Sequence, residues 1–324
     1  MLDAIRITPL AEESLGVRSM CTLVETPDTV ILLDPGVSLA PSRFGLPPHP
    51  EEFRAVRDSR RRILEAAQQA EVVLASHYHF DHITPGFKSW YEWTEEDTYR
   101  LVYSGKLVLA KDIEHNINFS QRRRGYVFRK LVSEVAREIL VADGAELTLG
   151  RTRIKCTDPM PHGAPGTRLG WVVGMLIEHQ NEKILYLPDV QGPMSGEALN
   201  WILSEKPDLV MIGGPPTYLA GMKVPEDAVN QGIENLARIA AQVDMIIVCH
   251  HLLRDIAWRE RLTQVFNAAG DKGGKVVSAA EYLGREAVLL EAQRKELYRE
   301  RPPSEEFMEW IRAGKKNRKT PPPI

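Results

Sequence analysis

The sequence predicts an α/β (α+β) protein in which helices lie outside two packed sheets. Three observations lead to this fold class. The first third of the chain consists of short strands joined by turns, strands and helices alternate from about residue 146 onward, and several strands are apolar throughout, as strands buried on both faces are. A single doubly wound sheet would give a similar periodicity, so the residues by themselves leave both arrangements open.

The first elements are three strands, a Pro-rich loop and a helix with apolar residues at helical spacing, at residues 5–11, 20–25, 29–36, 41–52 and 53–70. A short buried strand follows at 71–76, and the charged and aromatic segment 88–140 predicts a mostly helical insertion. Strands and helices then alternate at 146–150, 152–158, 171–179, 183–189, 195–206, 208–214, 225–242, 244–249 and 275–284.

The end of the chain predicts a separate helical element. Residues 284–313 are an amphipathic extension interrupted by Pro302 and Pro303, and residues 314–324 are expected to be a disordered tail. No apolar run is long enough for a membrane span, and the N-terminus has no signal-peptide pattern, so we expect no contact with a membrane.

Composition restricts the function classes. The chain has 324 residues, enough for a sizeable core, and its net charge of −3 argues against a wholly basic surface that coats nucleic acid. Three cysteines lie far apart without a CxxC pair, which favours a reduced, cytoplasmic protein. Among the short basic runs, only residues 122–124 lie beside aromatic side chains, Tyr126 and Phe128, and suggest an anionic substrate. The sequence leaves a homo-oligomer open.

One hexapeptide carries most of the chemical information. Residues 77–82 read H-x-H-x-D-H, with His77, His79, Asp81 and His82 directly after the buried strand at 71–76. Two histidines at i and i+2 on an extended segment can turn to one metal ion, and the following Asp-His pair can face a second. Imidazole and carboxylate together suit zinc, iron or manganese. A polar surface loop is the alternative, but the position at the end of a buried strand disfavours it.

Further imidazole and carboxylate groups follow other apolar runs. His162 lies in a loop after a strand, Asp189 ends the run 183–189, and His250 and His251 follow the run 244–249. Sites are commonly built where strand ends gather on one edge of a sheet, so these residues are candidates to join the hexapeptide.

This ordered set resembles the metallo-β-lactamase fold superfamily. The resemblance covers roughly residues 5–283 and implies a four-layer αββα sandwich, with a hydrolase domain over residues 1–283 and two divalent metal ions at one edge. It implies that His77, His79 and His162 hold the first ion, that Asp81, His82 and a later histidine hold the second, and that Asp189 bridges them. It further implies that Asp34, in ILLDPG, supports the site without binding metal.

The later histidine is His250 by the superfamily norm, with His251 as the alternative. Arg254 follows His250 at a spacing that resembles the His-x3-Arg of tRNA 3′-processing endonucleases. More narrowly, the stretches SLGVRSM, PHGAPGTRLGWVVG, YLPDVQGP and CHHLLRD resemble an uncharacterised, largely archaeal family regarded as metal-dependent hydrolases, without a known substrate.

The expected activity is hydrolysis by a hydroxide shared between two metal ions.

Zinc is the expected metal, and iron or manganese would suit the same imidazole and carboxylate ligands. A hydroxide shared by the two ions would attack a phosphoester or a related bond, in a small molecule or a nucleic acid. Asp81 and His162 are the candidate catalytic residues.

Arg18 and Arg254 are the candidates to bind an anionic substrate, with Lys111 as a weaker one. Two alternatives stay open: a thioester or lactone hydrolase of the same fold, and a non-catalytic nucleic-acid-binding module.

Overall fold

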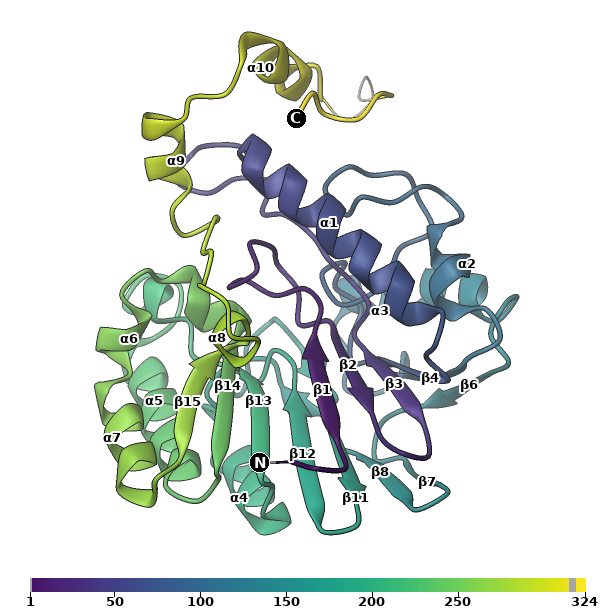
Figure 1. Cartoon of the computed structure of the whole chain (residues 1–324), viewed down its shortest axis with the longest axis vertical. Coiled ribbons are helices and arrows are strands. Elements are labelled where there is room, and N and C mark those ends of the chain that lie inside the picture. Colours follow the sequence, from purple (N-terminus) through teal and green to yellow (C-terminus); the bar gives the residue numbers. More distant parts are fainter. Residues whose placement is uncertain (1, 315–318) are drawn as a thin grey trace.

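The computed structural model describes residues 2–314 and 319–324, which form two facing β-sheets covered by helices (Figure 1). The first sheet has the strand order β1-β2-β3-β4-β5-β6, with β1 Arg6–Pro9, β2 Thr22–Glu25, β3 Val30–Leu33, β4 Val72–Ala75, β5 Leu107–Ala110 and β6 Glu138–Val141. The second has the order β15-β14-β13-β12-β11-β8-β7, with β7 Glu146–Leu149, β8 Thr152–Cys156, β11 Met175–His179, β12 Glu182–Leu187, β13 Leu209–Gly213, β14 Met245–Cys249 and β15 Lys275–Ser278. A small ribbon pairs β9 Met160–Pro161 with β10 Trp171–Val172.

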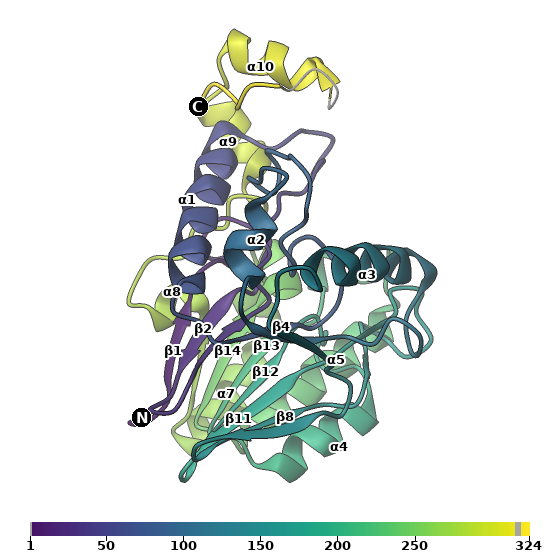
Figure 2. The same cartoon turned by 90° about the vertical axis from the view of Figure 1, so that its right-hand side faces the viewer.

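Helices cover the outer face of each sheet (Figures 1 and 2). The first sheet is covered by α1 Pro50–Ala67, α2 Thr98–Tyr103 and α3 Phe119–Val132. The second is covered by α4 Gly196–Glu205, α5 Glu226–Ala240, α6 Trp258–Arg261 and α7 Thr263–Lys272. None of the helices in the described ranges is long and apolar enough to cross a membrane.

Alternation along the strands explains why four layers form. In β4, Val72 and Leu74 face the space between the sheets, whereas Val73 and Ala75 pack beneath the helices of the first sheet. The same period of two recurs in β12, β13 and β14, whose alternate residues enter the central core or the core under α4, α5 and α7. Each central strand is therefore buried on both faces, and the predicted αββα sandwich is confirmed.

The segment 88–140 differs in part from its predicted helical character. It contains α2 and α3, but also β5 and β6, which extend the first sheet: β5 pairs in parallel with β4, and β6 pairs in parallel with β5. Both strands are only four residues long and lie between charged stretches, so their apolar runs are too short to stand out by periodicity.

The C-terminal extension packs on α1. It follows α8 Ala279–Tyr282 and contains α9 Arg294–Glu300 and α10 Glu305–Arg312. The fully buried Arg294 donates two hydrogen bonds to Glu52 of α1, and Phe307 packs edge-on against Phe53. Of the tail, residues 315–318 lie outside the described ranges; farther on, the Thr320 carbonyl accepts a hydrogen bond from Trp310.

Candidate metal centre

The candidate site lies where parallel strands end at one edge of the two sheets. Asp34 directly follows β3, the hexapeptide 77–82 begins two residues after β4, Asp189 lies two residues after β12, and His250 directly follows β14. Three of these residues adopt left-handed backbone conformations, with φ of 43° at Asp34, 54° at Asp189 and 52° at His250. Such backbone strain at non-glycine residues is typical of functional sites, because the surrounding fold must hold it in place.

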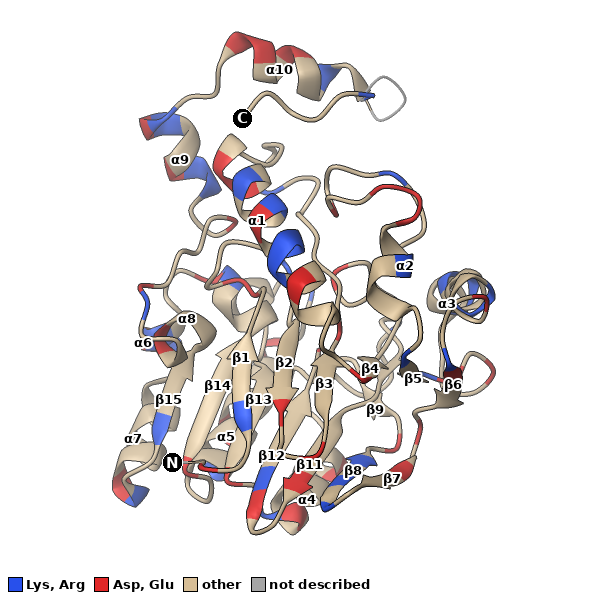
Figure 3. Cartoon of the chain, turned by 45° about the vertical axis from the view of Figure 1, so that its right-hand side comes forward, with Lys and Arg blue, Asp and Glu red and all other residues tan. Residues whose placement is uncertain are grey.

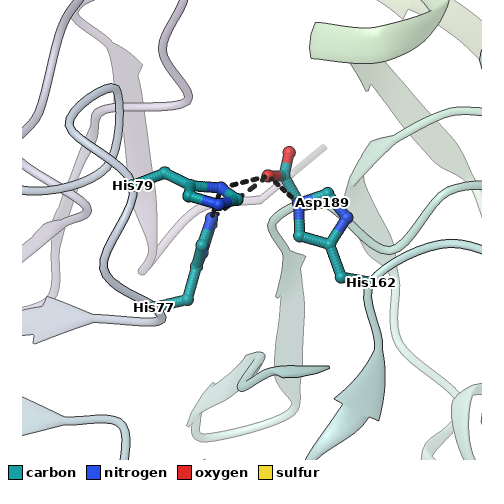
Figure 4. A group of neighbouring side chains, drawn as sticks. All are labelled: His77, His79, His162 and Asp189. Atoms are coloured by element: carbon teal, nitrogen blue, oxygen red, sulfur yellow. Dashed lines mark hydrogen bonds and ion pairs between the residues drawn. The ribbon is translucent and has the colours of Figure 1, made fainter. Parts of the chain in front are cut away.

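A first group of side chains converges on one oxygen of Asp189 (Figure 4). Its Oδ2 atom lies 2.8 Å from His162 Nε2, 3.2 Å from His77 Nε2 and 4.0 Å from His79 Nδ1. The histidines come from opposite sides, two from the loop after β4 and one from the loop after β9. Residues about 110 positions apart in the chain therefore face one point.

A second group lies beside the first and contains Asp81, His82 and His250. His250 Nε2 lies 3.4 Å from His82 Nε2, 3.5 Å from Asp81 Oδ2 and 3.0 Å from Asp189 Oδ1. Asp189 thus contacts both groups: its Oδ2 atom lies near the first group and 3.4 Å from His82 Nε2, and its Oδ1 atom lies near His250. His251 Nε2 also lies 3.2 Å from Asp189 Oδ1, but His251 does not belong to the group that contains Asp81 and His82.

These spacings fit divalent metal ions. A tetrahedral ion with ligand bonds of about 2.0–2.1 Å holds its ligand atoms about 3.4 Å apart, close to most of the separations above. Buried atoms without hydrogen-bond partners in the described structure also gather here: His162 Nε2, His251 Nε2 and Asp189 Oδ1. Because an unpaired polar atom is costly to bury, these atoms indicate that the site is built to bind a ligand.

Neighbouring acceptors determine which ring nitrogens are free. Ser76 Oγ donates to Asp34 at 2.6 Å, so the His77 Nδ1–H can donate to Ser76 Oγ at 3.0 Å and leave Nε2 unprotonated. His82 Nδ1 lies 2.8 Å from the same Asp34 carboxylate, which also accepts a hydrogen bond from the Tyr186 hydroxyl. Asp34 therefore orients the loop and does not face the Asp189 carboxylate itself.

The comparisons with known proteins agree with this architecture. Residues 29–250, more than half of the chain, match the family described as the beta-lactamase superfamily domain. The chain belongs to the β-lactamase superfamily. It also belongs to the UPF0282 family, since it is 46% identical to a UPF0282 protein of Methanopyrus kandleri over 90% of this chain and 99% of that one. A UPF0282 protein of Pyrobaculum islandicum is 45% identical over 91% of this chain and 95% of its own.

A solved structure supports the fold of this superfamily member. The crystal structure of Tm1679, a metal-dependent hydrolase of the beta-lactamase superfamily, matches 85% of this chain and 95% of its own at 14% identity and a TM-score of 0.50. Both predicted resemblances, to the superfamily and to the archaeal family, are thereby confirmed.

The charge states of His77 and His79 in this β-lactamase superfamily site suit metal binding, whereas His250 would have to give up a proton to bind a metal ion. Burial lowers the pKa of His77 well below its ordinary value and also lowers that of His79, so both rings are neutral at pH 7, the form that binds metal ions. Burial opposes the charge of His250, but Glu13 and Asp189 raise its pKa to about 10. Burial likewise opposes the charge of Asp81, yet His82 and His250 hold its pKa well below the usual range.

Two buried acids of this chain were missed by sequence reasoning. Glu13 lies 2.9 Å from His250 Nδ1 and accepts a hydrogen bond from Arg254, and Glu12 accepts one from the His250 backbone at 2.9 Å. Their only sequence signal is an acidic pair near the first strand, a pattern that is usual on protein surfaces. Only the fold shows that both side chains are almost fully buried.

Replacing Glu13 by glutamine is expected to lower the free energy of unfolding by about 3 kcal/mol, because Arg254 would lose its buried counter-ion. Urea denaturation measures this change. The control is Glu146→Gln, which breaks a half-exposed pair with Arg153 and should leave the free energy of unfolding close to that of the wild-type protein. Equal stabilities of the Glu13 and Glu146 variants would contradict the assigned role of Glu13.

A cavity of about 650 Å³ opens over both groups of ligand candidates. The sequence-predicted Arg18 and Arg254 line it, but each is paired with a buried acid, Arg18 with Glu291 at 2.6 Å and Arg254 with Glu13 at 2.9 Å. Lys111 is not among its lining residues, since its buried ammonium group donates to Asp143 at 2.6 Å. We name this space the site cavity.

Proposed function

We propose that this protein is a dinuclear metal-dependent hydrolase that cleaves phosphoesters. The observation that carries the proposal is the pair of ligand groups joined through the two oxygens of Asp189, in the wall of an open cavity. Superfamily membership supports metal-dependent hydrolysis in general terms. Arginine side chains in the cavity wall favour an anionic substrate over a neutral one.

In this proposal two groups of residues would hold the two ions, and Asp189 would belong to both. His77, His79 and His162 would hold the first ion. Asp81, His82 and His250 would hold the second, and His250 is preferred to His251 because its Nε2 atom approaches both Asp81 and His82. Two bound divalent ions would supply Lewis acidity that lowers the pKa of a water to about 7 and stabilises charge on the phosphate.

The residues of the chain then position the reactants. Asp81 lines the site cavity and stays ionised, so its carboxylate can orient the attacking water and accept one of its protons. The water oxygen forms a bond to phosphorus as the bond from phosphorus to the leaving oxygen breaks, and the leaving alkoxide takes up a proton from solvent. Arg254, placed by Glu13, adds positive charge beside His250.

The proposal predicts about two zinc, iron or manganese ions per chain in protein purified without chelator or affinity-tag nickel, measured by elemental analysis. Metal-loaded protein is expected to hydrolyse bis(4-nitrophenyl) phosphate, to lose this activity on chelation and to regain it when metal is restored. A chain that contains no metal and takes none up would contradict the proposal and favour the non-catalytic binding module.

Metal-loaded protein that cleaves only thioesters or lactones would replace the phosphoester assignment with the alternative hydrolase of the same fold. Cytoplasmic location and a homo-oligomeric state stay predictions.

A further inference from the structure

A second cavity of about 500 Å³ lies next to the site cavity and has an apolar lining. The loop after the ligand hexapeptide and one face of α3 form most of it. Its lining residues include Phe80, Phe87, Phe119, Arg124, Val127 and Phe128. We name this space the apolar pocket. Its volume is within the range of small-molecule sites.

The apolar pocket and the site cavity are neighbours that share one wall. Phe80, Phe87 and Arg124 line both spaces, and Phe80 directly precedes the ligand candidate Asp81. A small molecule that reaches from one space into the other would have to pass these three side chains, and its end in the site cavity would lie among the candidate metal ligands.

Helix α3 is held firmly against the ligand loop. A Cβ atom on Gly125 would lie 2.5 Å from the Tyr78 ring, so the helix and the loop make direct contact. The Tyr78 backbone N–H also donates to the Gln121 side chain at 3.1 Å. The position of the pocket wall is thus coupled to the position of His77 and His79 on either side of Tyr78.

Arg124 supplies the charge at the junction of the two cavities. Its guanidinium lies 5.0 Å from the centre of the Phe80 ring, and no carboxylate partner is found for it among residues 2–314 and 319–324. By contrast, Arg18, Arg254 and Lys88, which also line the site cavity, are each paired with an acid. Lys and Arg positions recur along α3, where they are marked in blue in Figure 3. Among the Lys and Arg residues that line the site cavity, Arg124 is therefore the one without an acid partner in the described structure, and its charge can meet an incoming anion.

We propose that the apolar pocket binds the hydrocarbon part of an amphiphilic ester substrate, whose anionic group contacts Arg124 at the mouth of the site cavity. That the substrate is an ester rests on the proposed function. That its hydrocarbon part binds in the apolar pocket rests on the arrangement of the two cavities. It makes Arg124 and the pocket face of α3 the determinants of substrate choice.

The test is calorimetric titration of the full-length protein with methyl phosphate and hexyl phosphate, which carry the same charge and differ by five methylenes. We expect hexyl phosphate to bind at least about tenfold more tightly, because each buried methylene strengthens binding severalfold. Arg124→Met should weaken both ligands about fivefold or more, since it removes the charge and keeps an apolar stem.

Val127→Glu should remove the preference for hexyl phosphate, because Val127 lines the apolar pocket and is exposed enough to be replaced without disturbing the core. The matched control is Tyr126→Glu, which adds the same charge to an exposed position of the same helix outside the pocket lining. Equal affinities for the two phosphates, or equal effects of the two glutamate variants, would overturn the inference.

Turnover separates this inference from the proposed function. If hexyl phosphate binds selectively but neither methyl nor hexyl 4-nitrophenyl phosphate is hydrolysed, the phosphoester assignment fails and the pocket assignment stands. If both esters are hydrolysed with equal kcat/KM and the two phosphates bind equally, the pocket assignment fails and the phosphoester assignment stands.

Discussion

The Asp189→Asn variant is expected to retain well below one metal ion per chain and to lose at least about 10³-fold in kcat/KM toward bis(4-nitrophenyl) phosphate. The reason is geometric. One carboxylate oxygen lies 2.8 Å from His162 Nε2 and the other 3.0 Å from His250 Nε2, so Asp189 joins the two ligand groups. An amide replaces one of these oxygens with a hydrogen-bond donor and removes the negative charge.

Asparagine is the informative substitution because it tolerates the left-handed backbone at this position, where φ is 54°. Alanine would add backbone strain to the loss of the carboxylate. The control is Asp208→Asn, at the opposite end of the same sheet, where the carboxylate accepts a hydrogen bond from the Lys183 backbone at 2.7 Å. It should keep its metal and activity. Full metal content in the Asp189 variant would show that the ligand assignment is wrong.

Replacing Gly36 by alanine is expected to lower the free energy of unfolding by about 3 kcal/mol and Tm by at least about 5 °C. A Cβ atom at Gly36 would lie 2.3 Å from the Ile83 nitrogen and 2.4 Å from two backbone atoms of His82. Backbone atoms cannot rotate aside as a flexible side chain can, so the ligand loop must move away from the Asp34 turn. The bound metal measured by elemental analysis should fall as well.

The matched substitution is Gly196→Ala, at the start of α4, where a Cβ atom would meet no neighbour within 4 Å. Its stability should stay within about 0.5 kcal/mol of the wild-type protein. If the two alanine variants had the same Tm, the close packing of Gly36 against the ligand loop would contribute nothing to the stability of the protein.

The sequence predicted the fold class and the location of the chemistry because both depend on local patterns. Apolar runs such as 71–76 and 244–249 indicate strands buried on both faces, and polar residues directly after such runs must lie at the sheet edge. His77, Asp189 and His250 were candidates for this reason, and in the structure the Nε2 atoms of both histidines lie within 3.2 Å of an oxygen of Asp189. The short strands β5 and β6 escaped because four residues carry too little periodicity.

The partners of these side chains depended on packing between distant segments. Arg18 pairs with Glu291, 273 residues away, and His250 with Glu13, 237 residues away, and no spacing rule connects positions so far apart. The apolar pocket likewise forms only because α3 packs against the loop after the hexapeptide. The candidate ligands therefore follow from the order of residues along the chain. Which charged side chains are paired with an acid follows from how the layers meet.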